Sequence, residues 1–553
     1  MQKHMGNIYA RKKGWYFGMG AVVKRGFDWF YCFNNGLPEF RACLKADMKL
    51  ADGLLNSARR EPGKTAMVFN GREYSYSQVK DRVYAVASAL SQTSLKPGDN
   101  VGLWSGNCPE YVEVLLGASL VGAVPELYNA RWSESVICDL IEQGSVRILF
   151  VGPNLPISAI ASKFPHIQII VIGDEVPNGA QGYGPFVASV PQSHFSPYEF
   201  GPCDTALHMF TSGTTSTPKC VLTSCGAVAM QTLISSSSER WSSSEVCLCC
   251  FPFFHVSGFS IYKVFLNGGT LVISKTAHAD EIAQLIERYH VTRAALVPIL
   301  MKELLNHKEK TGVNLSSLRL ISYGSTHVDS ELLARCAEVI GCGFYQAYGM
   351  TESAGPVTAL TPEDHADASL LETAGKPIFG ADVKIVSEDG FECPVGTTGE
   401  IVLRAYTTMR GYRDRDALTK EVLVDGWYHT RDCGYMDQRG YLHVEGRKDG
   451  MIISGGENIF PQELADCIGR MNGVVEADVI GVDDRKWGQC PIAFVVKNPE
   501  SDIDEQDVIG QCASRLGHFK KPRKVYFLDE LPRGGTGKVS ESELRNIHLA
   551  AQR

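Results

Sequence analysis

The chain has 553 residues, of which 44% are hydrophobic and 21% charged, and its formal net charge is −8. Such a length exceeds what one hydrophobic core supports, so two or three domains are expected, with the composition of an ordinary soluble protein. The negative charge argues against nucleic acid as the main partner. The 17 cysteines are scattered without zinc-ligand spacing, which favours reduced thiols in a cytoplasmic compartment.

The first 50 residues differ from the rest, with nine Lys or Arg against three acids and many aromatic residues. Two interpretations remain open for residues 1–45: peripheral contact with an anionic membrane, or an arm packed on the next domain. The longest apolar run, VLLGASLVGAVP from Val114, is too short to span a bilayer, and we see no secretory signal. We therefore expect a cytoplasmic protein.

From residue 66 the pattern alternates between short apolar runs and amphipathic helices. A strand at 66–70 precedes a helix that begins with a Ser75–Gln78 capping box and buries Val79, Val83, Val86 and Leu90. Further strands and helices are predicted near 100–105, 109–123, 146–152, 270–274, 282–289 and 319–325. This rhythm predicts parallel sheets covered by helices, and hence an α/β fold.

The pattern changes twice toward the C-terminus. Residues 383–446 read as short strands with glycine-rich turns, which indicates an antiparallel or barrel-like subdomain. A compact α+β pattern follows Arg447. We therefore predict an extension over 1–50, a large domain over 51–446 and a small domain over 447–553.

The segment TSGTTSTPK, residues 211–219, contains six hydroxyls, one glycine and a terminal lysine. Small residues leave backbone N–H groups free to face an anion, and hydroxyls and a cation add to them, as polyphosphate binding requires. A hydroxyl-rich surface loop is the alternative. The order of residues is not that of a Walker loop.

This segment resembles the phosphate loop of acyl-CoA synthetases and related adenylate-forming enzymes, usually TSGTTGxPKG, and YGMTE at 348–352 resembles their next signature. The resemblance implies that Tyr348 stacks on adenine, Thr351 binds the α-phosphate and Glu352 ligates Mg²⁺, for which one carboxylate plus phosphate oxygens suffices. It assigns to the nucleotide site Thr211, Ser212, Gly213, Thr214, Thr215, Lys219, Gly324, Ser325, Thr326, Gly349 and Met350.

Later motifs complete the resemblance, which covers about residues 50–545. Asp432 would accept the ribose hydroxyls and Arg447 would bind the same sugar, while Asp449 falls at the domain hinge. In LPRGGTGKVSESEL, Lys538 matches the family's catalytic lysine, which bridges carboxylate and α-phosphate. The loop lining the pantetheine tunnel of coenzyme A matches Gly455, Gly456, Glu457 and Asn458.

Four residues depart from the family pattern. Ser216 and Cys220 replace glycines in or beside the phosphate loop, Arg431 replaces a glycine next to Asp432, and Glu541 replaces a basic residue. The loop is expected to be stiffer than usual, or to hold pyrophosphate less closely. Arg431 would either reach the phosphates or crowd the sugar.

The reaction implied is ATP-dependent formation of an acyl adenylate, followed by transfer to coenzyme A. The resemblance implies a large N-terminal α/β domain and a mobile C-terminal α+β domain. ATP, Mg²⁺ and coenzyme A would be the cofactors, and Lys538, Thr351, Lys219 and His255 the catalytic residues. The small domain would reorient at Asp449 between the two steps.

The acid itself is predicted from the segment FPFFHVSGFSIY, residues 251–262, which contains no carboxylate to pair an ammonium group. An α-amino acid is therefore disfavoured. His255 would lie at the edge of the acyl pocket, with a packed core histidine as the alternative. The expected walls are apolar or small, which favours a medium or long fatty acid: Val256, Gly258, Phe259, Tyr323, Gly324 and Gly355.

Other interpretations stay open. A compact aryl acid of the coumarate type is the main rival substrate, and a carrier-protein phosphopantetheine is the rival acceptor. A luciferase-type oxygenase usually has a lysine where this chain has Ile453. A non-catalytic role would show as no pyrophosphate exchange with any acid.

Overall fold

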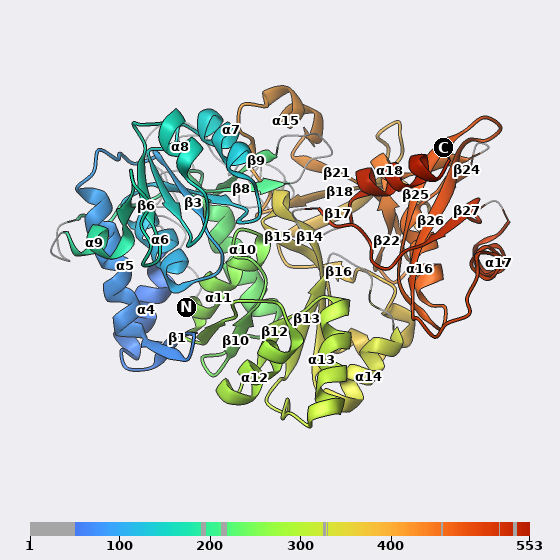
Figure 1. The fold of residues 1–553 in the computed structure, drawn as a ribbon, viewed down its shortest axis with the longest axis horizontal. Helices are drawn as coiled ribbons and strands as arrows, with labels where there is room; N and C mark the ends of the chain where they lie inside the picture. The colour runs from blue at the N-terminus through green and yellow to red at the C-terminus, as the bar shows by residue number, and fades with distance from the viewer. Residues whose placement is uncertain are drawn as a thin grey trace, which may run out of the picture. The chain divides into compact units, whose positions relative to one another are not determined.

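A computed structural model describes residues 50–189, 195–211, 218–324, 328, 330–454, 457–518, 520–534 and 539–552. The predictions made for residues 1–45 lie outside this part of the chain. Within it, four sheets organise the fold (Figure 1).

Two large sheets, mostly parallel, form the body of the large domain. The nine-stranded sheet runs in the order β16 (Lys376–Pro377), β15 (Gly355–Leu360), β14 (Gly343–Met350), β13 (Leu320–Gly324), β12 (Arg293–Ala295), β10 (Val246–Cys249), β11 (Thr270–Ile273), β1 (Thr65–Phe69) and β2 (Arg72–Ser75). The eight-stranded sheet runs β19 (Gly411–Tyr412), β9 (Lys219–Ser224), β8 (Thr205–Thr211), β4 (Val124–Tyr128), β3 (Asn100–Trp104), β5 (Ile148–Val151), β6 (Gln168–Val171) and β7 (Gln181–Gly182).

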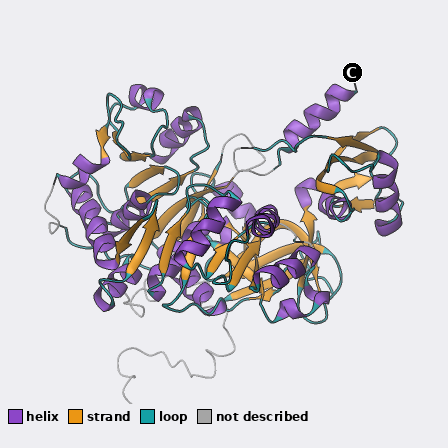
Figure 2. Ribbon diagram, turned by 60° about the horizontal axis from the view of Figure 1, so that its bottom comes forward, coloured by secondary structure: helices purple, strands orange, loops and turns teal. Residues whose placement is uncertain are grey.

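Helices pack on both faces of these sheets, as Figure 2 shows. One core cluster joins residues of both sheets to a shared set of helices: α4 (Asp52–Arg60), α5 (Tyr76–Ser91), α6 (Pro109–Leu120), α9 (Tyr183–Ala188), α10 (Cys225–Ser238) and α11 (Phe259–Asn267). A second cluster covers the other face of the nine-stranded sheet with α12 (Ala279–Tyr289), α13 (Pro298–Thr311) and α14 (Ser330–Ile340). A third covers the eight-stranded sheet with α7 (Glu134–Gly144) and α8 (Ser158–Lys163).

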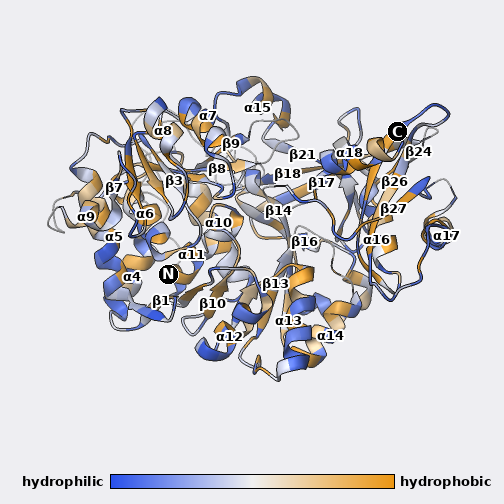
Figure 3. Ribbon diagram, viewed as in Figure 1, coloured by the Kyte–Doolittle hydropathy of each residue, from blue (hydrophilic) through white to orange (hydrophobic). Residues whose placement is uncertain are grey.

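The predicted elements of the large domain are confirmed. Ser75 and Gln78 form the capping box at the start of α5, with the Gln78 N–H donating to Ser75 Oγ over 3.2 Å. The four residues predicted for the buried face of α5 are all fully buried. In Figure 3 the strands are largely hydrophobic while outer helices such as α12 carry hydrophilic stretches, which is the pattern that a parallel sheet between helix layers requires.

The region after residue 380 forms an antiparallel sheet, as expected. Its strands are β17 (Ala381–Val386), β18 (Gly399–Ala405), β21 (Trp427–Met436) and β20 (Leu423–Val424) in order, with β22 (Leu442–Arg447) paired to β21 and α15 (Asp416–Val422) between strands. Short 3₁₀ turns occur at η1 (Val256–Gly258), η2 (Thr351–Ser353), η3 (Asp364–Ala366), η4 (Ala368–Leu370) and η5 (Lys448–Gly450).

The remaining sheet belongs to the small α+β domain. It is built from β24 (Glu457–Ile459), β23 (Ile452–Ser454), β26 (Gly488–Lys497), β25 (Val474–Asp484) and β27 (Lys524–Phe527), with α16 (Pro461–Gly469), α17 (Glu505–Leu516) and α18 (Glu541–Ala551). The domain boundary predicted at 446/447 falls where β22 ends and stays a prediction. No helix among the described residues is long and apolar enough to cross a membrane.

Candidate active site

The predicted phosphate loop joins two antiparallel strands. Thr211 ends β8, Lys219 begins β9, and the two residues are paired across the hairpin. The Lys219 ammonium lies 5.5 Å from the ring centroid of Tyr412, which holds the cation by its aromatic face. The hairpin therefore fixes both ends of the loop and places its lysine beside β19.

Tyr412 also links this lysine to the predicted magnesium ligand. Its hydroxyl donates to Glu352 Oε1 over 2.7 Å, and lies 3.4 Å from the hydroxyl of Tyr428. Glu352 belongs to η2 and is only 8% exposed, and burial followed by the charge of Glu352 raises the pKa of Tyr412. A carboxylate oriented in this way fits Mg²⁺, which binds one or two carboxylates together with phosphate oxygens.

A second group of side chains brings together three residues predicted for the nucleoside site, whose roles stay predictions. The Tyr348 hydroxyl donates to Asp432 Oδ2 over 2.7 Å, and Arg447 Nε lies 3.6 Å from Asp432 Oδ1. Asp432 and Arg447 are direct partners in the β21–β22 ladder, which explains how residues 15 positions apart meet. Burial, then the adjacent Asp432 carboxylate, raises the pKa of Tyr348 well above its usual value.

Glycines allow the strands around this group to approach closely. A Cβ atom at Gly349 would clash with the Gly355 carbonyl oxygen, and one at Gly324 would clash with the Ala347 carbonyl oxygen. Ser353 Oγ closes the turn by accepting from the Met350 N–H over 3.1 Å. The predicted residues Gly324, Tyr348, Gly349, Met350, Thr351 and Glu352 therefore lie along one β13–β14–η2 edge.

Arg431 pairs with an acid in this structure, and the two alternatives predicted for it stay open. Its guanidinium forms an ion pair with Glu421 of α15 over 2.9 Å, with both side chains substantially exposed. Its backbone has φ of +62°, a left-handed conformation that glycine adopts most readily. The family's glycine is thus explained by the turn, and the arginine here pairs with a neighbouring acid.

Cys220 is part of the core rather than of the loop. It is buried in the third cluster and pairs with Phe210 across the hairpin. Behind it, the fully buried Glu126 accepts from Arg413 and from Tyr128, the latter over 2.8 Å. Burial alone would raise the pKa of Glu126, but His208 and Arg413 outweigh it and the pKa is lowered. This ion pair anchors the segment after β19 to β4, the strand beside β8 of the hairpin.

One of the expected acyl-pocket residues requires correction. Tyr323 is buried in the second core cluster and its hydroxyl lies 2.9 Å from His365 Nε2, so it faces away from the side of β13 that Gly324 presents. Phe259 is buried in the central cluster, and its expected place on a pocket wall stays a prediction. His255 is half-buried against Phe254, with ring centroids 4.6 Å apart, at the entry to η1.

Several predicted residues lie outside the described part of the chain: Ser212, Gly213, Thr214, Thr215, Ser325, Thr326, Gly455, Gly456 and Lys538. Glu457 and Asn458 begin β24, but their side chains, like that of Asp449, are not described. The contacts of Tyr412 and Tyr428 were missed by sequence reasoning, because neither residue belongs to a short motif.

The comparisons with known proteins bear on this geometry. Residues 54–413 match the family model described as AMP-binding enzyme, and residues 463–538 match the AMP-binding enzyme C-terminal domain. The chain belongs to the AMP-binding enzyme family. The first match covers most of the chain and includes Lys219, Tyr348, Glu352 and Tyr412.

Three curated relatives of this AMP-binding enzyme are informative. A 2-succinylbenzoate–CoA ligase of Bacillus cereus is 32% identical over 504 residues, covering 89% of this chain and 98% of the relative. An indoleacetate–CoA ligase of Aromatoleum aromaticum is 32% identical over 505 residues (90% and 98%). A fatty acid–[acyl-carrier-protein] ligase of Streptomyces coeruleorubidus is 30% identical over 496 residues (88% and 94%).

The fold agrees with this assignment. The o-succinylbenzoate CoA synthetase of Bacillus subtilis, solved with an acyl-adenylate intermediate, superposes with a TM-score of 0.77 at 27% identity, covering 89% of this chain and 97% of that one. This AMP-binding enzyme is therefore an adenylate-forming acid–thiol ligase, whose cofactors are ATP, Mg²⁺ and coenzyme A.

Proposed function

We propose that the protein activates an aryl carboxylic acid with ATP and transfers the acyl group to coenzyme A. The observation that carries the proposal is the arrangement around the end of β14, where Lys219 and Glu352 flank Tyr412 and Tyr348 holds Asp432. Two of the three relatives are named for aromatic acids. The aryl-acid interpretation is therefore better supported than the fatty acid predicted first.

In the first step a carboxylate oxygen of the substrate attacks the α-phosphorus of ATP, forming an acyl–O–P bond and releasing pyrophosphate. Lys219 and the phosphate loop would neutralise the polyphosphate, and Thr351 would bind the α-phosphate. Glu352 would hold Mg²⁺, which supplies charge neutralisation at the phosphate oxygens when bound. Asp432, aligned by Tyr348 and Arg447, would fix the ribose.

In the second step the thiol sulfur attacks the acyl carbon, and AMP leaves with the electron pair of the broken C–O bond. The adenylate is reactive because AMP is a far better leaving group than oxide. Lys538 would act in the first step only, since it lies on the small domain that reorients between steps.

A carrier-protein phosphopantetheine is the second candidate acceptor, favoured by the relative that loads an acyl-carrier protein. Both acceptors present the same thiol chemistry. Thioester formation with free coenzyme A at a kcat close to that of pyrophosphate release would favour coenzyme A as the acceptor. Accumulation of the adenylate in the presence of free coenzyme A would favour the carrier protein.

The substrate class is tested with a panel of acids, ATP and coenzyme A, with products read by mass spectrometry. We expect benzoates, arylacetates and cinnamates to exceed chains of ten to sixteen carbons in kcat/KM. Higher kcat/KM for a saturated fatty acid than for every aryl acid would return the assignment to the fatty-acid interpretation.

A further inference from the structure

A cavity lies between α11 and the nine-stranded sheet, outside the groups described above. Its volume is about 50 Å³, room for a few polar atoms of a ligand. Polar and charged side chains line much of it: Glu239, Trp241, Ser257, Ser260, Lys263, Arg293 and Ser322. Residues 251–262, from which we predicted apolar pocket walls, therefore border a charged cavity, because Lys263 and Arg293 lie outside that segment.

The cavity continues the sheet face on which the adenylating residues lie. Ser322 lies two residues before Gly324 on β13, and alternate residues of a strand share a face. Arg293 is paired with Leu320, four residues before Gly324, so its backbone is roughly 13 Å from that glycine at the usual strand rise. An acid whose carboxylate reaches Gly324 would point its far end toward this cavity.

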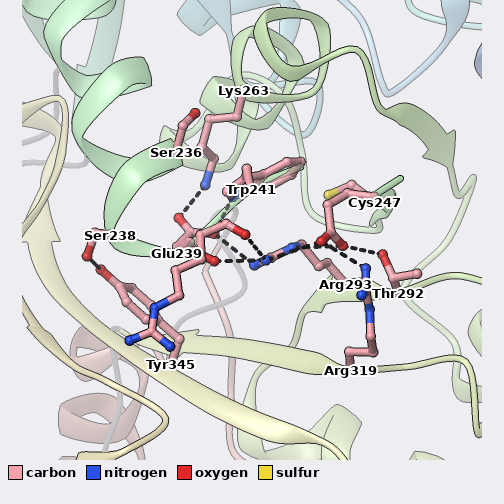
Figure 4. Close-up of polar contacts among 12 residues, drawn as sticks. Ser236, Ser238, Glu239, Trp241, Cys247, Lys263, Thr292, Arg293, Arg319 and Tyr345 are labelled. Carbon is pink, nitrogen blue, oxygen red and sulfur yellow. Dashed lines mark hydrogen bonds and ion pairs between the residues drawn. The ribbon is translucent and has the colours of Figure 1, made fainter. Parts of the chain in front are cut away.

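The charges around the cavity form a connected network (Figure 4). Lys263 Nζ donates to Glu239 Oε1 over 2.7 Å, and Trp241 Nε1 donates to Glu239 Oε2 over 2.9 Å. Arg293 Nε lies 3.0 Å from Glu245 Oε2, and Arg319 Nη2 donates to Glu245 Oε1 over 2.9 Å. Trp241 lies between the two cations: its ring centroid is 5.3 Å from Lys263 Nζ and 5.0 Å from Arg293 Cζ.

The network has hydrogen-bond donors to spare. Within the described part of the chain, Nε and Nη1 of the buried Arg293 make no hydrogen bond, although Nε is ion-paired with Glu245 and Nη1 lies 4.0 Å from Glu239. The largely buried acids Glu239 and Glu245 are matched in charge by the largely buried bases Lys263 and Arg293, while Arg319, whose side chain is 56% exposed, adds a cation outside the cavity. An anionic group in the cavity would accept hydrogen bonds from the Arg293 nitrogens that make none.

We propose that this cavity binds an anionic group, most simply a second carboxylate, at the far end of the acid that the enzyme activates. The inference rests on the proposed function and narrows its substrate class to acids with a distal anion. Lys263 and Arg293 are its specificity-determining residues. The second carboxylate accepts hydrogen bonds and takes no part in bond making.

The first experiment compares substrates that differ only at the far end. The set contains benzoates with a para –(CH₂)n–CO₂⁻ group for n of one to four, their distal methyl esters, and 4-alkylbenzoates of equal length. We expect kcat/KM for the best diacid to exceed that of its ester by about tenfold or more, the effect of one charge-assisted hydrogen bond. Diacid-to-ester ratios below about three at every length would overturn the proposal.

The second experiment uses variants. Lys263→Met should reduce the diacid-to-ester ratio by about tenfold, because it removes one cation and keeps the length of the side chain. The matched control is Arg240→Met, whose ion pair with Glu363 is exposed and outside the cavity, and it should leave the ratio and the rates unchanged. An unchanged ratio in folded Lys263→Met would contradict the role assigned to Lys263.

Failure of the proposed function can be distinguished from failure of the cavity assignment. If no aryl acid releases pyrophosphate, the same comparison is made with linear α,ω-diacids of six to twelve carbons and their monomethyl esters. A preference for the diacid there would keep the cavity assignment while discarding the aryl substrate. No preference for a diacid in either series would overturn the cavity assignment.

Discussion

The carboxylate of Asp432 is held by Tyr348 on one side and by Arg447 on the other. Tyr348 lies 84 positions from Asp432 in the sequence, so this contact is not local. The YGMTE motif with Tyr348 and the later segment with Asp432, which were recognised separately in the sequence, therefore form one structural unit. A fixed carboxylate binds hydroxyls better than a mobile one, because less conformational entropy is lost on binding.

Tyr348→Phe tests this unit. Loss of the 2.7 Å hydrogen bond frees Asp432 and should raise the KM for ATP by about three- to tenfold, with a smaller effect on kcat. The measurement is initial-rate kinetics at saturating acid. Tyr84→Phe, on α5 and away from the site, serves as the control. An unchanged KM for ATP would show that Asp432 needs no support from Tyr348.

Arg431→Gly tests the ion pair with Glu421. Glycine relieves the left-handed backbone strain, while only an exposed ion pair is lost, so stability should be unchanged or rise by up to about 1 kcal/mol. The KM for ATP should stay within twofold. A large rise in that KM would mean that Arg431 reaches the nucleotide during turnover.

At the scale of elements, the β8–β9 hairpin and the β14–η2 edge carry most of the site. Arg413 bonds to the hairpin through its N–H, which donates to the Cys220 carbonyl oxygen over 2.9 Å, and is itself paired with the buried Glu126 of β4, while glycines allow the close contacts of the β14–η2 edge. The small domain has its own electrostatic feature on β25. Burial raises the pKa of Asp478 to about 6, and the nearby Glu476 and Glu541 add to the effect.

This shift predicts a pH-dependent stability. Because the folded-state pKa of Asp478 lies above the unfolded value, the folded protein binds the proton more tightly, and its stability falls as pH rises from about 4 to about 6. Asp478→Asn should stabilise the protein by about 1–3 kcal/mol at pH 8 and have little effect at pH 4. Melting temperatures at the two pH values measure this. Equal effects at both would refute the assignment.

At the scale of the whole molecule, the chemistry requires both domains. Lys538→Ala should abolish adenylate formation while thioester formation from a supplied acyl adenylate continues at near the parental rate, because the lysine is needed only in the first conformation. Pyrophosphate release and single-turnover thioester formation separate the two steps. Similar losses in both would argue against a division of roles.

Local patterns predicted local features of the fold well. The α5 capping box, the strands of the parallel sheets and the antiparallel region after residue 380 follow from short-range periodicity and turn residues. Contacts over long sequence distances could not be predicted in this way. Tyr412 with Glu352, Arg413 with Glu126 and the Glu239–Arg293 network join elements 50 to 290 residues apart, with no signal in either segment.

The same limit explains the errors about the acyl pocket. The segment 251–262 is apolar, but the cavity beside it receives its charges from α10's end, from α11 and from β12. Tyr323 was assigned to a pocket wall from its neighbours in sequence, whereas strand alternation turns it into the second core.

The central claim is that the acid is activated as an adenylate, and isotope transfer tests it most directly. An aryl acid labelled with ¹⁸O in its carboxylate is incubated with ATP, Mg²⁺ and coenzyme A, and the nucleotide and phosphate products are analysed by mass spectrometry. We predict one ¹⁸O atom in AMP, none in pyrophosphate, and one aryl-CoA per AMP. Label in inorganic phosphate together with ADP, or turnover without label in AMP, would contradict it.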